Sequence, residues 1–253
     1  MSRRYWRNMN QIKLCNVKID DVTPEEAVNF ALLDRGEPCW TVTPNATMLD
    51  ACRRDGEKAA LLNRATLSLP DGAGVLLAAR RRGTPLKGRV AGIEFGEALL
   101  SRAAHEGLRV FLLGGAEGVA ERAAVRLGLR YPGLCVCGYY WGYFQKGGEE
   151  DRRVTELIRA ARPDILFVCM GFPIQETWIG AHLSLLGEVR VVAGLGGSLD
   201  VWAGELRRAP RIVSRVGLEW AWRMAREPRR LKHLPALARF LFCTGHEKKN
   251  GDL

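Results

Sequence analysis

Short apolar runs alternate with amphipathic helical segments from about residue 11 to residue 200, and this alternation constrains the fold of the 253-residue chain. Most runs are continuously apolar, which is typical of strands that are buried on both faces of a parallel sheet. The segments between them are about 12–15 residues long, the usual length of a helix that connects two parallel strands. We therefore expect a doubly wound α/β fold with a mostly parallel sheet. The expected strands are Ile12–Val17, Cys39–Thr43, Thr66–Leu69, Val110–Leu113, Leu134–Gly138, Ile165–Cys169 and Val189–Ala193.

Two of the helical segments show clear ends. Thr23 followed by Pro24 and Glu26 has the pattern of an N-cap with a capping box. The segment near residues 149–162 begins with acidic residues and ends with arginines, as the helix dipole favours, and it carries one apolar stripe. Both segments are predicted to be helices that cover the sheet.

The chain changes character after residue 203. The formal net charge of the whole protein is +10, and residues 204–253 contain twelve Lys or Arg residues and five Asp or Glu residues, a net charge of +7. No further strand is expected there, and aromatic residues are interleaved with the basic ones. We expect residues 1–203 to form a Rossmann-like α/β domain and residues 204–253 to form a basic helical C-terminal appendage. Such a charge balance indicates a polyanionic partner, such as nucleic acid, a phosphorylated substrate or an anionic membrane surface.

The sequence shows no signal for export or for a structural metal. The basic N-terminus is not followed by an apolar run, so a secretory signal is not expected. The longest apolar stretch, around residues 165–170, is far shorter than the roughly 20 residues that cross a bilayer. None of the seven cysteines forms a Cys-x-x-Cys pair, and the four histidines lack ligand spacing. We expect a cytoplasmic protein with buried thiols and no metal.

Polar residues and glycines follow five of the expected strands, where an open parallel sheet binds its ligands. These segments are Thr43-Pro44-Asn45, Pro70-Asp71-Gly72, Gly114-Gly115, Gly171 to Glu176 and Gly194 to Ser198. They bring hydroxyl, amide, carboxylate and backbone N–H groups to one rim of the sheet. The sequence therefore predicts a ligand site at that rim.

Several of these residues also have a purely structural interpretation. On the residues alone, Asp71 is better explained as the N-cap of the helix that follows it, and Asn45 is an equally good N-cap. Gly114-Gly115 and Gly196-Gly197 suit either a phosphate at a helix N-terminus or a tight turn. Arg89 lies between two glycines and beside apolar residues, so its guanidinium requires an anionic partner, either structural or substrate.

Taken together, the motifs resemble the WecG/TagA/CpsF glycosyltransferase family, in family order and over nearly the whole chain. They are Thr43–Asn45, Pro70–Val75, Pro85–Gly92, Phe111–Gly115, Gly142–Phe144, Pro163–Val168, Gly171–Glu176, Gly194–Gly204, Arg208–Pro210, Gly217–Trp220 and Glu227–Arg230. The resemblance implies transfer of N-acetylmannosamine or its uronic acid from a UDP donor, with inversion and without a metal. The implied acceptor is N-acetylglucosamine on undecaprenyl diphosphate, used in teichoic acid or polysaccharide assembly at the cytoplasmic face of the plasma membrane.

The resemblance also suggests roles for particular residues. Asp71 corresponds to the catalytic base, the substrate-positioning groups correspond to Thr43, Asn45, Arg89 and Gln175, and Tyr143 and Asp200 match positions near the nucleotide. Without a metal, the charge of the leaving diphosphate must be neutralised by helix N-termini at Gly114-Gly115 and Gly196-Gly197 and by arginines. A helix places residues 223, 226 or 227 and 230 on one face, and we expect Arg223, Arg229 and Arg230 to meet the acceptor diphosphate. The other basic and aromatic residues of the appendage are expected to contact an anionic membrane.

Two departures from the family pattern concern the rim. Phe172 and Ile174 stand where a hydroxyl residue and a lysine are usual, which leaves UDP-glucose or the uronic acid of UDP-N-acetylmannosamine as alternative donors. The pair Lys87-Gly88 precedes Arg89 where an acidic residue is common.

Two other classes of function are less well supported. An NAD-dependent oxidoreductase would need a G-x-G-x-x-G motif, which is absent. A nucleic-acid-binding module could use the basic appendage, but the chain has no recognised nucleic-acid motif, so we expect no nucleic-acid partner. The sequence leaves open whether the protein forms a homo-oligomer.

Overall fold

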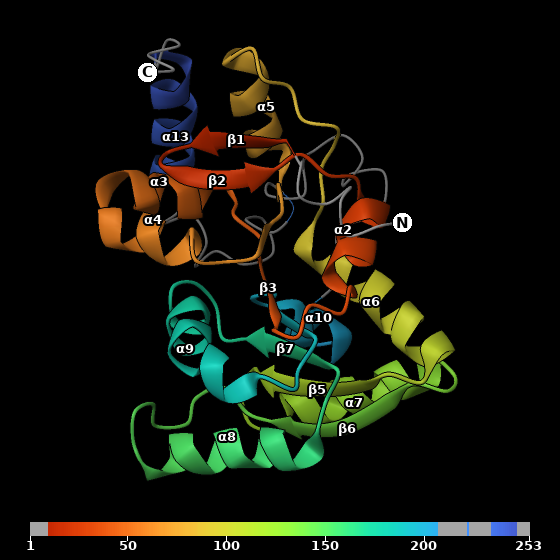
Figure 1. The fold of residues 1–253 in the computed structure, drawn as a ribbon. Helices are drawn as coiled ribbons and strands as arrows, with labels where there is room; N and C mark the ends of the chain where they lie inside the picture. Colours follow the sequence, from red (N-terminus) through yellow and green to blue (C-terminus); the bar gives the residue numbers. More distant parts are fainter. Residues whose placement is uncertain (1–9, 207–221, 223–233, 247–253) are drawn as a thin grey trace.

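A six-stranded sheet forms the centre of the molecule in the computed structural model, which describes residues 10–206, 222 and 234–246 (Figure 1). The strands are β3 (Cys39–Val42), β4 (Leu67–Ser68), β5 (Arg109–Gly114), β6 (Cys135–Tyr140), β7 (Ile165–Cys169) and β8 (Val191–Gly194). Their order is β4-β3-β8-β7-β5-β6, and every neighbouring pair is parallel. The predicted parallel α/β sheet is confirmed.

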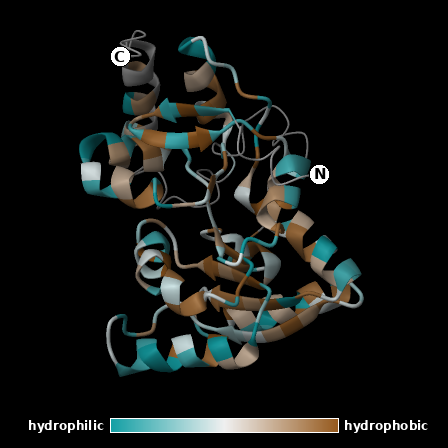
Figure 2. Ribbon diagram, in the orientation of Figure 1, coloured by the Kyte–Doolittle hydropathy of each residue, from teal (hydrophilic) through white to brown (hydrophobic). Residues whose placement is uncertain are grey.

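Helices cover both faces of this sheet, so the chain is doubly wound. One apolar core contains α2 (Pro24–Ala31), α6 (Gly92–Glu106), α7 (Val119–Arg130) and α10 (Ser198–Trp202). The other contains α3 (Ala46–Arg54), α4 (Gly56–Leu62), α5 (Ala73–Arg81), α8 (Glu149–Ala161), α9 (Ile174–His182) and α13 (Leu234–His246). A short 3₁₀ helix, η1 (Leu183–Leu186), follows α9. Successive residues of β7 alternate between the cores, with Phe167 in the first and Leu166 in the second, which is why this strand reads as continuously apolar (Figure 2).

The first expected strand, Ile12–Val17, was wrong, because this segment is part of a hairpin. β1 (Gln11–Leu14) and β2 (Val17–Asp20) pair antiparallel in a separate two-stranded sheet. The chain reverses at Cys15 and Asn16, whose φ angles of 49° and 64° lie in the left-handed region. Two such residues in succession form the tight turn that matches the twist of a hairpin. Asn tolerates this conformation, but Cys15 lies inside an apolar run and gives no turn signal.

The two helices with predicted ends are confirmed. The Thr23 side chain accepts a hydrogen bond from the backbone of Glu26, and the Glu26 side chain accepts one from the backbone of Thr23, which completes a capping box at the start of α2. Helix α8 begins with three acidic residues and buries Val154 and Ile158. Its outer side is hydrophilic in Figure 2.

The described part of the appendage, α13, packs against α3 and α5. Ala236 and Phe240, one helical turn apart, are buried, and Phe240 is part of the second core. Arg239 of α13 also pairs with the fully buried carboxylate of Asp50 in α3 at 3.0 Å. The division of the chain at residues 203 and 204 stays a prediction. Within the described residues, no helix is long and apolar enough to cross a membrane.

Candidate functional site

Backbone hydrogen bonds join the loops that carry four of the predicted site residues. The N–H of Asp71, in the loop after β4, donates to the carbonyl oxygen of Pro44, in the loop after β3, at 3.2 Å. The N–H of Val90 donates to the carbonyl oxygen of Pro70 at 3.0 Å. Pro44 lies between Thr43 and Asn45, and Val90 follows Arg89. These two bonds therefore bring Thr43, Asn45, Asp71 and Arg89 to one place at the carboxyl ends of β3 and β4.

Asp71 is not the N-cap of the following helix, so its structural interpretation was wrong. Helix α5 begins at Ala73 with Gly72 as its N-cap, and no side chain caps it. Gly72 has a φ of 101°, a conformation that L side chains rarely adopt, and it turns the chain into the helix one residue after Asp71. Asp71 is partly exposed at this turn. Asp71 therefore lies at the rim and does not cap α5.

Asn45 is an N-cap, as its alternative interpretation predicted. Its Oδ1 accepts hydrogen bonds from the backbone N–H groups of Thr47 at 3.0 Å and Met48 at 3.1 Å, at the start of α3. The neighbouring Thr43 is buried, and its hydroxyl donates to the carbonyl oxygen of Gly194 in β8 at 3.4 Å. Both residues are at the rim, and both hold its backbone in place.

Arg89 has a carboxylate partner within the protein. Its Nη2 donates to Oε1 of Glu94, in the first turn of α6, at 3.0 Å, and its side chain is 19% exposed. The preceding Lys87 is anchored separately. Its backbone N–H donates to Asp21 at 2.6 Å, and its ammonium group pairs with Glu26 at 2.9 Å, which lowers the pKa of the Glu26 carboxyl. The loop before Arg89 is therefore held by acidic residues from the end of β2 and from α2.

Gln175 links the two loops at the middle of the sheet. Its Oε1 accepts from the N–H of Gly171, after β7, at 3.1 Å and from the N–H of Gly196, after β8, at 3.0 Å. Its Nε2 donates to Oε1 of Glu176 at 2.8 Å. Both side chains are buried, and burial raises the pKa of Glu176 to about 7. The predicted residue Gln175 thus lies buried at the rim, between the loops that follow β7 and β8.

A second group of predicted residues meets between β5 and β7. The N–H of Gly115 donates to the carbonyl oxygen of Cys169 at 3.2 Å, and the N–H of Gly142 donates to the carbonyl oxygen of Gly115 at 2.8 Å. Tyr143, next to Gly142, is 74% exposed. From β5 the chain continues toward β6, and from β7 it continues the other way, toward β8. The gap between such strands is the usual ligand site in a doubly wound sheet.

The loop that carries Tyr143 is fixed by acidic residues at the start of α8. Glu150 accepts from the backbone N–H of Gln145 at 2.9 Å, and Asp151 accepts from the N–H of Gly147 at 2.7 Å. Asp151 is itself buried and also accepts from Nε1 of Trp178 in α9 at 2.7 Å. These bonds hold the loop that follows Tyr143.

The remaining predicted residues lie nearby or outside the described part. Gly196 has a φ of 54°, and an added Cβ at Gly197 would be 3.4 Å from the Asp200 carboxylate, so these three residues are together after β8. Ile174 is 53% exposed at the first position of α9. Arg223, Arg229 and Arg230 lie outside the described residues.

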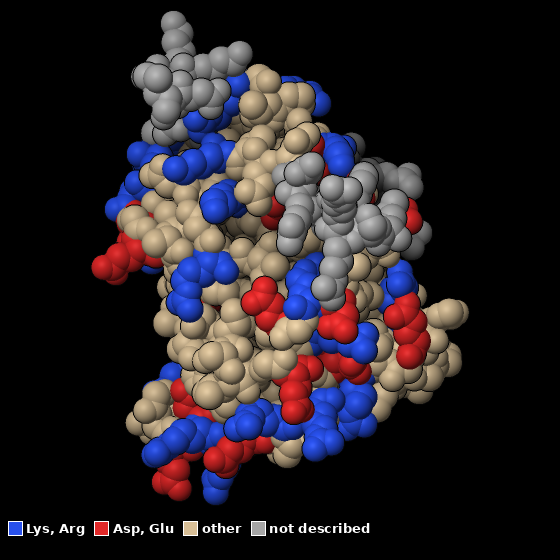
Figure 3. All heavy atoms as spheres, in the orientation of Figure 1, with Lys and Arg blue, Asp and Glu red and all other residues tan. Residues whose placement is uncertain are grey.

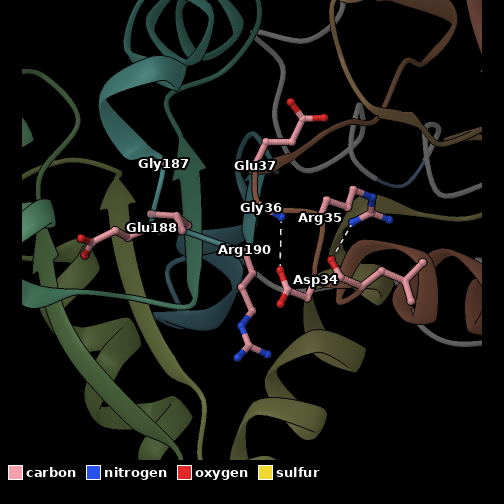
Figure 4. A pocket seen from close by; sticks show the side chains of 9 residues that line it. Asp34, Arg35, Gly36, Glu37, Gly187, Glu188 and Arg190 are labelled. Atoms are coloured by element: carbon pink, nitrogen blue, oxygen red, sulfur yellow. Dashed lines mark hydrogen bonds between the residues drawn. The ribbon is translucent and has the colours of Figure 1, made fainter. Parts of the chain in front are cut away.

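A small pocket at the opposite end of the sheet is not this site. It is formed by residues 33–37 and 187–190, which precede β3 and β8 (Figure 4). Three of its charged groups have partners in the protein. Arg190 pairs with Asp164 at 3.3 Å, Asp34 accepts from the N–H of Gly36 at 3.2 Å, and Arg35 donates to the carbonyl oxygen of Leu33 at 3.0 Å. The pocket lies at the amino ends of the strands, away from the rim.

The cysteines are buried or partly buried, as predicted, wherever the structure describes them. Burial raises the pKa of the Cys39 thiol to about 11 and that of the Cys169 thiol to about 12. Thiols with such pKa values are protonated at neutral pH and are poor nucleophiles. Among the described residues, no three His, Cys, Asp or Glu side chains are grouped to hold a metal ion.

Comparison with known proteins identifies the family. The sequence profile described as "Glycosyl transferase WecG/TagA/CpsF family" matches residues 12–252. The chain belongs to this family of glycosyltransferases. A relative from Bacillus spizizenii, strain W23, is 33% identical over 209 residues, covering 83% of this chain and 79% of its own length. A relative from Staphylococcus aureus, strain MW2, is 32% identical over 246 residues, covering 96% and 95%. Both are N-acetylglucosaminyldiphosphoundecaprenol N-acetyl-β-D-mannosaminyltransferases.

In this glycosyltransferase, the acidic residues that bind the side chains or backbone of the rim residues were not identified from the sequence. Glu94, Asp21 and Glu176 hold Arg89, Lys87 and Gln175, respectively. Glu176 follows Gln175 directly in the sequence motif, and Glu94 lies five residues after Arg89, whereas the contact of Lys87 with Asp21 depends on the tertiary fold.

Proposed function

We propose that this glycosyltransferase transfers N-acetylmannosamine, with inversion, from UDP to N-acetylglucosamine linked to undecaprenyl diphosphate. The activity of the two relatives carries this proposal, because the S. aureus protein aligns with 96% of this chain. The acceptor is a lipid used in teichoic acid or polysaccharide assembly. The roles proposed for residues at the rim are supported by where the structure places them.

Asp71 is the proposed general base. It takes the proton of the acceptor hydroxyl while that oxygen attacks the anomeric carbon of the donor sugar. The bond from this carbon to the diphosphate breaks on the opposite face, so the configuration inverts and UDP leaves with the bonding electron pair. The position of Asp71 supports this role, because it is partly exposed at the strand ends and does not cap α5.

The leaving diphosphate is proposed to be stabilised by protein groups, without a metal ion. Arg89 is near Asp71, and the backbone at Gly114-Gly115 borders the gap between β5 and β7. Preorganised N–H donors and arginines stabilise charge that develops in a transition state. Tyr143, exposed beside this gap, is the proposed contact of the nucleotide. Arg223, Arg229 and Arg230 are proposed to bind the acceptor diphosphate.

The donor is proposed to carry a neutral sugar. Phe172 and Ile174 flank Pro173 beside Gln175, and Ile174 is 53% exposed there. An aliphatic side chain offers no charge to a sugar carboxylate. This supports N-acetylmannosamine over its uronic acid and leaves UDP-glucose as the alternative within the family.

The enzyme is proposed to bind the cytoplasmic face of the plasma membrane peripherally. On α13, Ala236 and Phe240 are buried, whereas Phe242 is 76% exposed and Leu234 is 41% exposed. Basic side chains predominate around the end of the molecule that carries α5 and α13, whereas acidic and basic side chains alternate over α8 (Figure 3). Exposed aromatic residues beside arginines are typical of a surface that contacts anionic lipid.

Release of UDP from a panel of UDP-sugars tests the proposal. The assay contains lipid-diphosphate-linked N-acetylglucosamine and EDTA, with a control that omits the acceptor. We expect acceptor-dependent release with UDP-N-acetylmannosamine alone. If only UDP-glucose gave release, the donor would be UDP-glucose and not UDP-N-acetylmannosamine. Release that EDTA abolishes would contradict metal independence, and no release with any donor would contradict the proposed reaction.

A further inference from the structure

The carboxyl group of Glu176 is buried beneath the rim and has no role in the proposed reaction. Its side chain is fully buried, and only one of its two oxygens is satisfied. Oε1 accepts from Nε2 of Gln175 at 2.8 Å, whereas Oε2 has no hydrogen-bond partner among the described residues. A buried polar atom without a partner is unfavourable for folding, and such groups often have a functional reason.

The partner of Glu176 connects two loops of the rim. Gln175 accepts hydrogen bonds from the N–H groups of Gly171 and Gly196, at 3.1 Å and 3.0 Å. These glycines follow β7 and β8, the two central strands. The carboxamide oxygen of Gln175 therefore bridges these two loops.

Only one orientation of the Gln175 carboxamide satisfies all three bonds. If the group were rotated by half a turn, its NH₂ would face two backbone N–H donors, and its oxygen would face Oε1 of Glu176. A side-chain amide carries donors on nitrogen and an acceptor on oxygen, so the rotated form would lose all three bonds. The acceptor oxygen of Glu176 thus favours the same orientation of the carboxamide as the two backbone N–H donors and adds a third bond to it.

The pair has little room to rearrange. An added Cβ at Gly194, in β8, would lie 2.8 Å from Nε2 of Gln175 and 3.5 Å from Oε1 of Glu176. The two side chains therefore pack closely under the end of β8. Loss of the bond between them would change the carboxamide contacts at the rim directly.

We propose that Glu176 is a positioning residue that holds the carboxamide of Gln175 in one orientation and thereby shapes the binding site of the nucleotide donor. This rests on the proposed function, which places a UDP-sugar at the gap beside β7. Glu176 acts through Gln175 and does not touch the reacting atoms.

Three substitutions at Glu176 test this role, with UDP as the probe. Glu176→Gln keeps an acceptor oxygen, Glu176→Met removes it at similar volume, and Glu176→Asp withdraws it by one methylene. Ile179→Val, also fully buried on α9, is the control for a change in the core alone. We expect Glu176→Met and Glu176→Asp to weaken UDP binding in calorimetry roughly tenfold, the loss of about one hydrogen bond. In these two variants the KM for the donor should rise by a similar factor, and the KM for the acceptor should not change. In Glu176→Gln and Ile179→Val, UDP affinity and donor KM should stay within about twofold of the wild type.

Hydrogen exchange at the N–H groups of Gly171 and Gly196 tests the positioning role of Glu176 independently of the identity of the donor. Exchange at both should accelerate in Glu176→Asp and Glu176→Met and remain as in the wild type in Glu176→Gln. If the wild type does not bind UDP but exchange changes in this pattern, the donor is wrong and the positioning role holds. Unchanged exchange and unchanged UDP affinity in folded Glu176→Asp would overturn the proposal, and that variant suffices if Glu176→Met does not fold.

Discussion

The backbone N–H of Asp71 donates a hydrogen bond to the carbonyl oxygen of Pro44 at 3.2 Å. This bond joins the proposed base to the turn that contains Thr43 and Asn45. Because it uses the main chain, it places Asp71 independently of the chemical nature of its side chain. The same holds for the bond from Val90 to Pro70 on the other side of Asp71.

Asp71→Asn should therefore leave the fold intact and stop the reaction. The amide cannot accept the acceptor proton, and general-base catalysis typically contributes a factor of about 10² to 10⁴. We expect kcat to fall within this range, with UDP affinity and the circular dichroism spectrum unchanged. Glu188→Gln, an exposed acid at the opposite end of the sheet, is the control and should keep full activity. Turnover near the wild-type value in Asp71→Asn would exclude Asp71 as the base.

Arg89→Met should reduce kcat/KM by roughly tenfold to a hundredfold, because charge-assisted hydrogen bonds contribute about 1.5–3 kcal/mol each. Arg102→Met provides a matched control, since Arg102 pairs with Glu106 at 2.7 Å on the exposed side of α6. That exposed pair should contribute little to stability and nothing to the reaction. A kcat/KM in Arg89→Met equal to that of Arg102→Met and of the wild type would exclude a role of Arg89 in the reaction.

The sheet could be predicted from sequence because strands buried on both faces are continuously apolar, as in β7. The hairpin could not, because its turn depends on the backbone of Cys15 and Asn16. At the rim, Asn45 and Asp71 give the same signal, a polar residue just before a helix. Only the φ of 101° at Gly72 separates the cap from the carboxylate that does not cap.

Glu176 could not be assigned from sequence for a different reason. An acidic residue in the first turn of a helix is usually explained by the helix dipole and by solvent. Here α9 packs against β7, β8 and α4, and the carboxyl group is buried. Its role depends on tertiary packing that no local pattern records.

The buried Glu176 should make stability depend on pH in a defined direction. Burial raises its pKa from the usual 4.5 to about 7, so the folded state holds a proton that the unfolded state releases. The contribution of this group is fully present below about pH 4.5 and is lost as the pH rises to about 7. Compared with Glu176→Gln, the wild type should thus lose about 3 kcal/mol of unfolding free energy over this interval. Urea unfolding at pH 4.5, 6 and 8 measures the difference, and a constant difference would show that Glu176 does not hold a proton there.

Of two phenylalanines on α13, one should contribute to stability and the other to membrane binding. Phe240 is fully buried against the second core, whereas Phe242, two residues further, is 76% exposed. Phe240→Ala should cost about 3–5 kcal/mol of unfolding free energy, the usual range for a buried phenylalanine. Phe242→Ala should leave stability within about 0.5 kcal/mol of the wild type. It should weaken binding to vesicles that contain anionic phospholipid several-fold, because an interfacial aromatic ring is lost. Sedimentation with these vesicles and with neutral ones measures the effect. Phe242→Trp should retain binding, and unchanged sedimentation of Phe242→Ala would exclude this face of α13 from the membrane contact.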